Sequence, residues 1–210
     1  MAVNYEILSA FALATALLSI SPGPDNLFVL TQSMVYGKKF GLATTAGLMT
    51  GCLVHTTLLA LGVSALIKAR PNLYMFIKFF GAMYLFYLAY RVMSGKESLP
   101  IGPVSTPKKG LWQLYRQGFV MNVLNPKVTI FFLAFFPGFL FSDTLGLVWQ
   151  FYILGGVFIL VSFSVFGCFV LLADAISIHM RGGSGRASIV KWLQVVVFLG
   201  IGIYLLLSRN

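Results

Sequence analysis

Long apolar stretches alternate with short polar segments along this chain. A bilayer core about 30 Å thick requires roughly 20 apolar residues per helix at ~1.5 Å rise per residue. Six stretches reach this length, and they cover residues 7–36, 41–67, 72–93, 116–140, 146–174 and 188–207. The stretches lack the ~10-residue alternation of a membrane β-barrel. The pattern therefore predicts an all-α polytopic membrane protein with six transmembrane helices, in a single membrane domain over residues 1–210.

Composition agrees with this pattern. The chain has 210 residues, of which 59% are hydrophobic and 10% charged, and its mean hydropathy is +0.90. So little polar surface cannot cover a soluble globule of this size. The first stretch has Glu6 and no basic residues before it and stays apolar well beyond the core of a signal peptide, so we expect it to be retained.

The formal net charge of +10 is informative through its distribution between the predicted spans, and we expect no nucleic-acid partner. The loops after the first, third and fifth spans hold ten basic residues: Lys38, Lys39, Arg91, Lys96, Lys108, Lys109, Arg116, Arg181, Arg186 and Lys191. The opposite side has Lys68, Arg70 and Arg209. By the positive-inside rule, these three basic loops are cytoplasmic and both termini lie outside.

The first span is interrupted in its middle by the sequence SISPGPDNLFVL, residues 19–30. Pro22 and Pro24 donate no N–H group and clash with the preceding turn, and Gly23 accepts backbone angles that other residues resist. A continuous helix over residues 7–36 would be about 45 Å long at ~1.5 Å per residue, too long for one perpendicular crossing. We therefore expect two half-helices. Irregular backbone at membrane depth persists only where it is buried in protein or lines a cavity, so we expect the break between them to lie in such a place.

The fourth span, residues 116–140, is interrupted in the same way by the sequence NVLNPKVTI. This segment contains Pro126 as a second helix-breaking position, with Asn122, Asn125 and Lys127 around it. Interrupted segments at matching positions in two halves of a chain are typical of the binding site of a transporter.

Two halves of three helices each cross the bilayer in opposite senses, so this arrangement predicts inverted repeats. The first repeat covers residues 1–95 and the second covers residues 116–210. A basic, Pro/Gly/Ser-rich linker over residues 96–115 joins them on the cytoplasmic face.

Three sequences, in this order, resemble the LysE/RhtB family of amino-acid exporters: SPGPDN, GLATTAGLMTGCLVHTTLLALGV and NVLNPKVTIFFLAFFPGF. The resemblance covers the whole chain. It implies a multi-pass protein of the bacterial inner membrane, a secondary active transporter that exports amino acids against proton entry without a cofactor. It also favours a homodimer, together with the small-residue faces of the helices. It does not assign the cargo, because members with different substrates share these motifs.

An amino-acid cargo brings an ammonium and a carboxylate to the membrane midplane, and we expect Asp25 to face the ammonium. The carboxylate would rest at the amino ends of the half-helices after the interruptions, near Ser21 or Asp25 and near Asn125, where N–H groups are unpaired. Ser21 before Pro22 and Asn125 before Pro126 each read as an N-cap followed by proline. The predicted substrate-binding residues are Ser21, Gly23, Asp25, Asn26, Asn122, Asn125 and Lys127.

Two alternatives stay open for the charged groups. Asp25 and Lys127 either bind cargo or form a buried ion pair that holds the halves together, and a pair that opens for cargo would do both. Asp25 and His55 are the candidates for proton coupling. His55 either relays protons or hydrogen-bonds to a neighbouring helix. The small residues of the same span, such as Gly47 and Gly51, favour close helix packing.

Rival functions have weaker support. A small-cation exporter would need hard oxygen ligands, and of five acidic residues only Asp25 lies clearly within a span. Cys52 and Cys168 form no pattern with metal-ligand spacing, so we expect no metal site and interpret both as packing residues. A membrane enzyme would need a catalytic arrangement that the sequence lacks. A passive channel, or an exporter of another small metabolite, remains an alternative. A basic cargo would require a second buried carboxylate, which favours neutral cargo.

Overall fold

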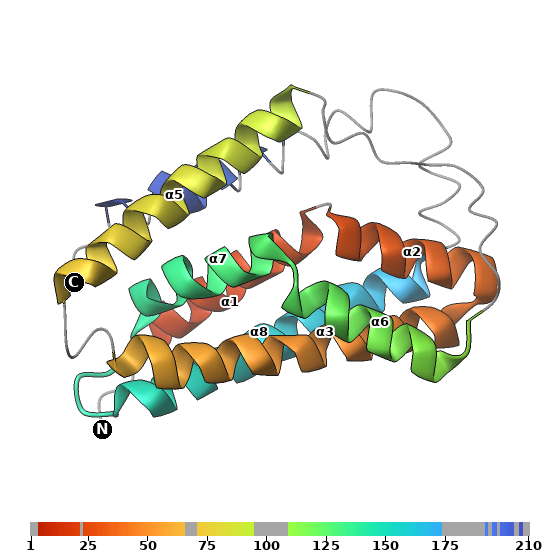
Figure 1. Ribbon diagram of the computed structural model, residues 1–210, viewed down its shortest axis with the longest axis horizontal. Coiled ribbons are helices and arrows are strands. Elements are labelled where there is room, and N and C mark those ends of the chain that lie inside the picture. Colours follow the sequence, from red (N-terminus) through yellow and green to blue (C-terminus); the bar gives the residue numbers. More distant parts are fainter. Residues whose placement is uncertain are drawn as a thin grey trace.

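The computed structural model describes the helical part of the chain that surrounds both interruptions. The described residues are 4–21, 23–65, 71–94 and 109–173, with 192, 195, 196, 198–203, 206 and 207 near the C-terminus. The elements in chain order (Figure 1) are α1 (Tyr5–Ile20), α2 (Pro24–Tyr36), α3 (Lys38–Leu58), the π-helix η1 (Leu59–Val63), α5 (Pro71–Met93), α6 (Leu111–Val123), α7 (Pro126–Phe135), the 3₁₀-helix η2 (Phe136–Phe139) and α8 (Leu147–Leu171). The prediction of an all-helical chain is confirmed over these residues.

Two helical segments are long and apolar enough to cross a bilayer alone, Lys38–Val63 and Leu147–Leu171. Two helix pairs pass the same test as single bent spans. The pair α1 and α2 bends by 63°, and α6 bends by 52° against α7 with η2. The described residues therefore contain two to four candidate spans, with interruptions in the predicted first and fourth. Of the sixth predicted span, the structure describes only residues 192, 195, 196, 198–203, 206 and 207. Six spans and inverted repeats therefore stay predictions.

The second half-helix of the first span begins two residues later than its sequence indicates. Ser21 is the C-cap of α1, because its N–H group donates to the carbonyl oxygens of Leu17 and Leu18 at 3.1 and 3.2 Å. The expectation that Ser21 caps the second half-helix is therefore wrong. That N-cap is Gly23, and Pro24 occupies the first helical position, where a missing N–H costs nothing. Pro22 lies outside the described residues.

The second interruption follows its prediction closely. Asn125 is the N-cap of α7, and its Oδ1 accepts a hydrogen bond from the N–H group of Lys127 at 3.0 Å. Pro126 follows as the first helical residue. This is the arrangement expected from an Asn-Pro sequence, because the asparagine side chain satisfies an N–H group that the helix leaves unpaired.

Helices α3 and α6 form the most extensive helix contact among the described elements. Glycines on both helices make this approach possible. A Cβ atom on Gly47 would meet the carbonyl oxygen of Tyr115, and one on Gly118 would meet the carbonyl oxygen of Thr44. A Cβ atom on Gly51 would lie 2.7 Å from Asn122 Oδ1. The prediction that small residues of this span serve close helix packing is confirmed, and this packing brings α3 against the second interruption.

Seven phenylalanine rings in contact with one another lie in the apolar core between α1, α7, η2 and α8. They are Phe11, Phe131, Phe132, Phe135, Phe136, Phe139 and Phe158, and each is at most 5% exposed. The rings meet both stacked and edge-on, with the Phe132 and Phe136 centroids 4.1 Å apart and those of Phe11 and Phe136 4.9 Å apart. This cluster fixes α7, and with it the position of the second interruption.

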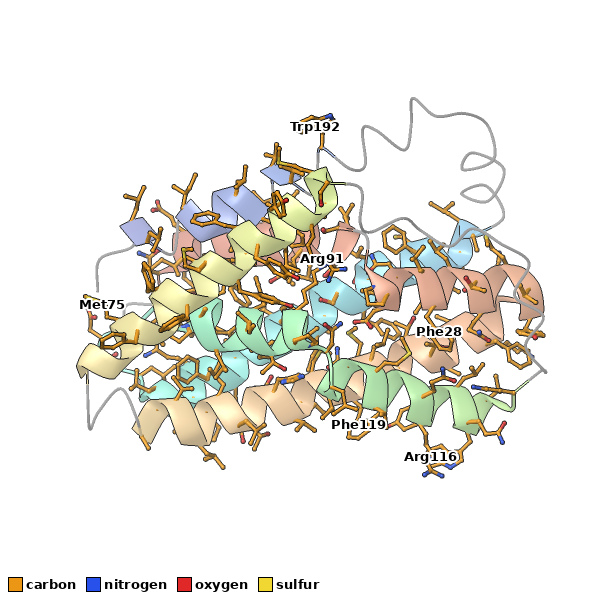
Figure 2. The ribbon with its side chains drawn as sticks, turned by 45° about the horizontal axis from the view of Figure 1, so that its top comes forward. Phe28, Met75, Arg91, Arg116, Phe119 and Trp192 are labelled. Atoms are coloured by element: carbon orange, nitrogen blue, oxygen red, sulfur yellow. The ribbon has the colours of Figure 1, made fainter. Side chains whose placement is uncertain are left out.

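Seven of the helix ends gather at opposite ends of the molecule. Figure 1 shows the end of α2, the beginnings of α3 and α6 and the end of α8 at one end, with the beginnings of α1, α5 and α8 at the other. The exposed basic residues Lys38, Lys39 and Arg116 therefore share an end. Figure 2 shows the Arg116 side chain extending outward from α6. The described basic residues at the beginnings of α3 and α6 thus lie at the same end, whereas those of the fifth loop lie outside the described residues.

Gln150 in the first turn of α8 secures the loop that precedes this helix. Its Oε1 accepts from the N–H groups of Phe141 and Ser142 at 2.8 and 3.0 Å. Its Nε2 donates to the carbonyl oxygens of Ser142 and Leu145 at 2.8 and 2.7 Å. Gln150 is 1% exposed. One buried amide thus satisfies four backbone groups that the loop would otherwise leave unpaired.

Candidate substrate site at the two helix interruptions

A cavity of about 50 Å³ lies where the two interruptions meet. The first interruption contributes Gly23, Asp25 and Asn26 to its lining, and the second contributes Asn122, Asn125 and Lys127. These are six of the seven predicted substrate-binding residues. At roughly 10–15 Å³ for each water molecule, the cavity has room for about four waters, so a cargo the size of an amino acid requires it to widen. The remaining wall comes from α1, α3 and α8.

One hydrogen bond joins the two interruptions directly. Asn125 Nδ2 donates to Asp25 Oδ2 at 2.9 Å, between residues 100 positions apart in the chain. Both side chains are 9% exposed. Because Asn125 also caps α7 through its Oδ1, the same amide orders the second half-helix and holds the one carboxylate among the described lining residues.

Lys127 brings an ammonium group from α7 to the first interruption. Its Nζ lies 5.0 Å from the centroid of the Phe198 ring and 3.5 Å from the position that a Cβ atom would occupy on Gly23. A ring face attracts a cation, most strongly away from water. The cavity wall therefore carries a carboxylate and an ammonium, which are complementary to the two charged groups of a zwitterion.

The other two predicted amides are engaged within the protein. Asn26 Nδ2 donates to the carbonyl oxygen of Ser19 at 2.7 Å, so it satisfies an acceptor that the end of α1 leaves open. Asn122 Oδ1 faces the thiol of Cys52 at 3.7 Å. Both amides lie in the lining of the cavity, and Asn26 joins the beginning of α2 to the end of α1.

Ser21 lies apart from this group. Its side chain is fully buried, it is absent from the cavity lining, and its Oγ has no hydrogen-bond partner among the residues that the structure describes. The backbone of Ser21 continues α1 instead of opening α2, which turns its side chain away from the site.

His55 does not line the cavity but contacts Asn122, which does. Its Nε2 is 3.1 Å from the carbonyl oxygen of Asn122, and its ring packs on Phe132 with 5.4 Å between centroids. A carbonyl oxygen only accepts, so Nε2 carries the hydrogen in this bond. The predicted hydrogen bond to a neighbouring helix is confirmed, and the proton-relay role stays a prediction.

The sequence reasoning missed a second polar contact at the cavity. Ser19 Oγ of α1 and Ser162 Oγ of α8 lie 2.9 Å apart, and both residues line the cavity. Ser162 lies in the apolar run FILVSFSVFG, and a polar residue in such a run was the one feature of the sequence that could have indicated this contact. Cys52 is buried and also lines the cavity. Cys168 is exposed in the single chain, so the interpretation of Cys168 as a packing residue within the chain is wrong.

Possible metal ligands do not gather in this region: among the residues described, no three His, Cys, Asp or Glu side chains come together.

The family model described as LysE type translocator matches residues 16–209 of the chain. This chain belongs to the LysE-type translocator family. Together with the apolar helices, membership makes it a multi-pass membrane transporter.

Curated relatives extend the comparison. The homoserine/homoserine lactone efflux protein of Salmonella typhimurium is 29% identical over 209 residues, which are 99% of this chain and 100% of the relative. Its counterpart from Salmonella typhi has the same identity and coverage. An uncharacterized membrane protein of Pseudomonas aeruginosa is 34% identical over 133 residues, and this match spans 61% of the chain and 62% of that relative. No solved structure matches the chain.

Proposed function

We propose that this LysE-type translocator exports small neutral amino acids from the cytoplasm across the bacterial inner membrane in exchange for protons. The observation that carries the proposal is the cavity at the two interruptions, which places Asp25 and Lys127 in one wall. The full-length relatives named for homoserine and homoserine lactone efflux support a small cargo of this kind.

Asp25 binds the ammonium of the cargo, and the carboxylate binds near Lys127 and the amino end of α7. The N–H groups of the first turn of α7 point out of the helix at that end, where the helix dipole favours an anion. The cargo enters by replacing the bond between Asn125 Nδ2 and Asp25 Oδ2. In this proposal Asp25 also pairs with Lys127 while no cargo is bound, and this pair opens as cargo binds, so binding and opening are the same event.

Neutral cargo follows from the charges of the cavity. Among the lining residues that the structure describes, Asp25 supplies the one carboxylate and Lys127 the one ammonium. A basic amino acid would place a second cation against a wall whose described residues include no second carboxylate to receive it. An acidic amino acid would have to share Lys127 between two carboxylates. A zwitterion leaves neither charge without a partner.

Proton antiport follows from competition at one carboxylate. Asp25 binds either a proton or the ammonium of the cargo, and it cannot hold both. A transporter that crosses only with Asp25 occupied must therefore exchange one for the other. His55, bonded to the carbonyl oxygen of Asn122, lies one helix away and is the second residue that we assign to proton movement.

Alternating access in this proposal is a rocking of two inverted repeats, residues 1–95 and 116–210, about the interruptions. The pattern of helix contacts supports it, because α3 of the first half packs on α6 and α8 of the second half packs on α1. In each half, the second span (α3 or α8) thus contacts the first half-helix of the broken span in the other half (α6 or α1). The basic ends of the helices face the cytoplasm, both termini lie outside, and two copies form a homodimer.

Purified protein in proteoliposomes tests this function with labelled homoserine as cargo. With a lumen more acidic than the bath, we expect uptake above equilibrium, because protons leave as cargo enters. Lys127→Ala should weaken uptake, while Lys39→Ala, which removes an exposed lysine at the start of α3, should leave it unchanged. Equal flux with and without the gradient would indicate a passive channel. Absence of flux for all neutral amino acids in tight vesicles would contradict the proposal.

A further inference from the structure

The hydroxyl groups of Ser19 and Ser162 differ in their bonding from many of the described helix hydroxyls. Seven of these donate to the carbonyl oxygen four residues earlier in the chain: Ser33, Thr44, Thr45, Thr50, Thr56, Thr129 and Ser164. Ser19 and Ser162 instead bond to each other across α1 and α8, at 2.9 Å. They are 6% and 1% exposed, and both line the cavity.

Counting donors shows what this pair offers to a ligand. Two serine hydroxyls have two O–H donors and four acceptor lone pairs, and the bond between them uses one of each. Neither hydroxyl makes another hydrogen bond within the described part of the chain. One O–H donor and several lone pairs thus remain at the cavity wall, which matches a ligand hydroxyl that both donates and accepts.

The surroundings of the pair are apolar and ordered. Phe158 and Phe166, one turn before and one turn after Ser162 on α8, line the same cavity. The carbonyl oxygen of Ser19 is held by Asn26 Nδ2 at 2.7 Å, and Asn26 follows Asp25 in the first turn of α2. The hydroxyl pair is therefore a polar point on an apolar wall, tied through one amide to the helix that carries the carboxylate.

We propose that the Ser19–Ser162 pair determines cargo specificity by binding a side-chain hydroxyl. This inference rests on the proposed function and adds the residues that select among neutral amino acids. A hydroxylated side chain satisfies the free O–H donor of the pair. An aliphatic side chain of the same shape leaves that donor unpaired against apolar atoms, so it binds less well.

Matched cargoes test this assignment in the same proteoliposomes. Homoserine and norvaline differ by one hydroxyl in place of a methyl group, and so do threonine and valine. In the unmodified protein we expect the hydroxylated member of each pair to be transported with about tenfold higher kcat/KM, the effect of roughly one buried hydrogen bond. In the Ser19→Ala and Ser162→Ala double variant, this ratio should fall to about one.

The control is Ser164→Ala, which removes an exposed hydroxyl of α8 that bonds within its own helix, and it should keep the ratio. If the serine pair only holds α1 against α8, the double variant should transport the hydroxylated and the aliphatic cargo equally less well, and the ratio of their kcat/KM values should stay unchanged. An unchanged ratio would overturn this inference while leaving amino-acid export intact. Lack of transport of all four amino acids by the unmodified protein would overturn the proposed function, and the specificity assignment with it.

Discussion

Replacement of Asp25 by asparagine separates the charge of the site from its shape. The amide has nearly the same size and can still accept the 2.9 Å bond from Asn125 Nδ2. A hydrogen bond to a charged acceptor contributes about 1.5–3 kcal/mol, and one between neutral groups about 0.5–1.5 kcal/mol. The contact between the interruptions therefore weakens by about 1 kcal/mol. Removing a carboxylate at membrane depth relieves about 2.5–3.5 kcal/mol, so the folded protein should be equally stable or more stable.

Transport should respond in the opposite direction. Without a carboxylate, the ammonium of the cargo loses a charge-assisted bond, and about 1.5–3 kcal/mol corresponds to a roughly 10–150-fold weaker affinity. A side chain that does not bind a proton also cannot exchange it for cargo. We therefore expect Asp25→Asn to abolish uphill uptake of homoserine and to leave at most slow downhill flux.

The assay combines two measurements on the same purified samples. Thermal unfolding in detergent reports stability, and uptake into proteoliposomes with and without a proton gradient reports coupling. Asp143→Asn is the matched control, because it makes the same chemical change in an exposed loop residue outside the cavity. Gradient-driven accumulation by Asp25→Asn at the unmodified level would refute the role of Asp25 in both binding and coupling.

Three further predictions concern the backbone around the site. Asn125→Ala removes the cap of α7 and leaves the Asp25 carboxylate without its donor, so thermal stability should fall by about 2–4 kcal/mol and uptake should fall with it; Asn125→Ser should recover the cap alone. Gly47→Ala should prevent folding or lower the melting temperature strongly, because its Cβ meets the α6 backbone, whereas Gly62→Ala has open space and should be neutral in the same thermal assay. Gln150→Leu leaves four backbone groups of the loop before α8 unpaired, and limited proteolysis should then cleave this loop much faster, unlike in the unmodified protein.

Several features were predictable because they depend on local chemistry. The Asn125-Pro126 sequence indicates a cap and a helix start, and the structure has both. Near Ser21 the same reasoning was wrong, since Ser21 remains bonded to α1 and Gly23 opens α2. Two prolines separated by glycine leave more than one position at which the second half-helix can begin, and local preferences alone do not choose between them.

The sequence by itself determined the membrane environment, the approximate helix spans, the places where helices break, and the acidic, basic and amide groups available at those breaks. Each of these depends on a single residue or a short run, through apolar length or a missing N–H group. The tertiary structure alone decided which groups meet: Asp25 with Asn125, Ser19 with Ser162, and His55 with the backbone of Asn122. The physical reason is that lipid is as apolar as the protein interior, so a hydrophobic pattern does not mark the inward face of a membrane helix. That face is set by close approach at glycines such as Gly47 and Gly118, and only the packed helices reveal it.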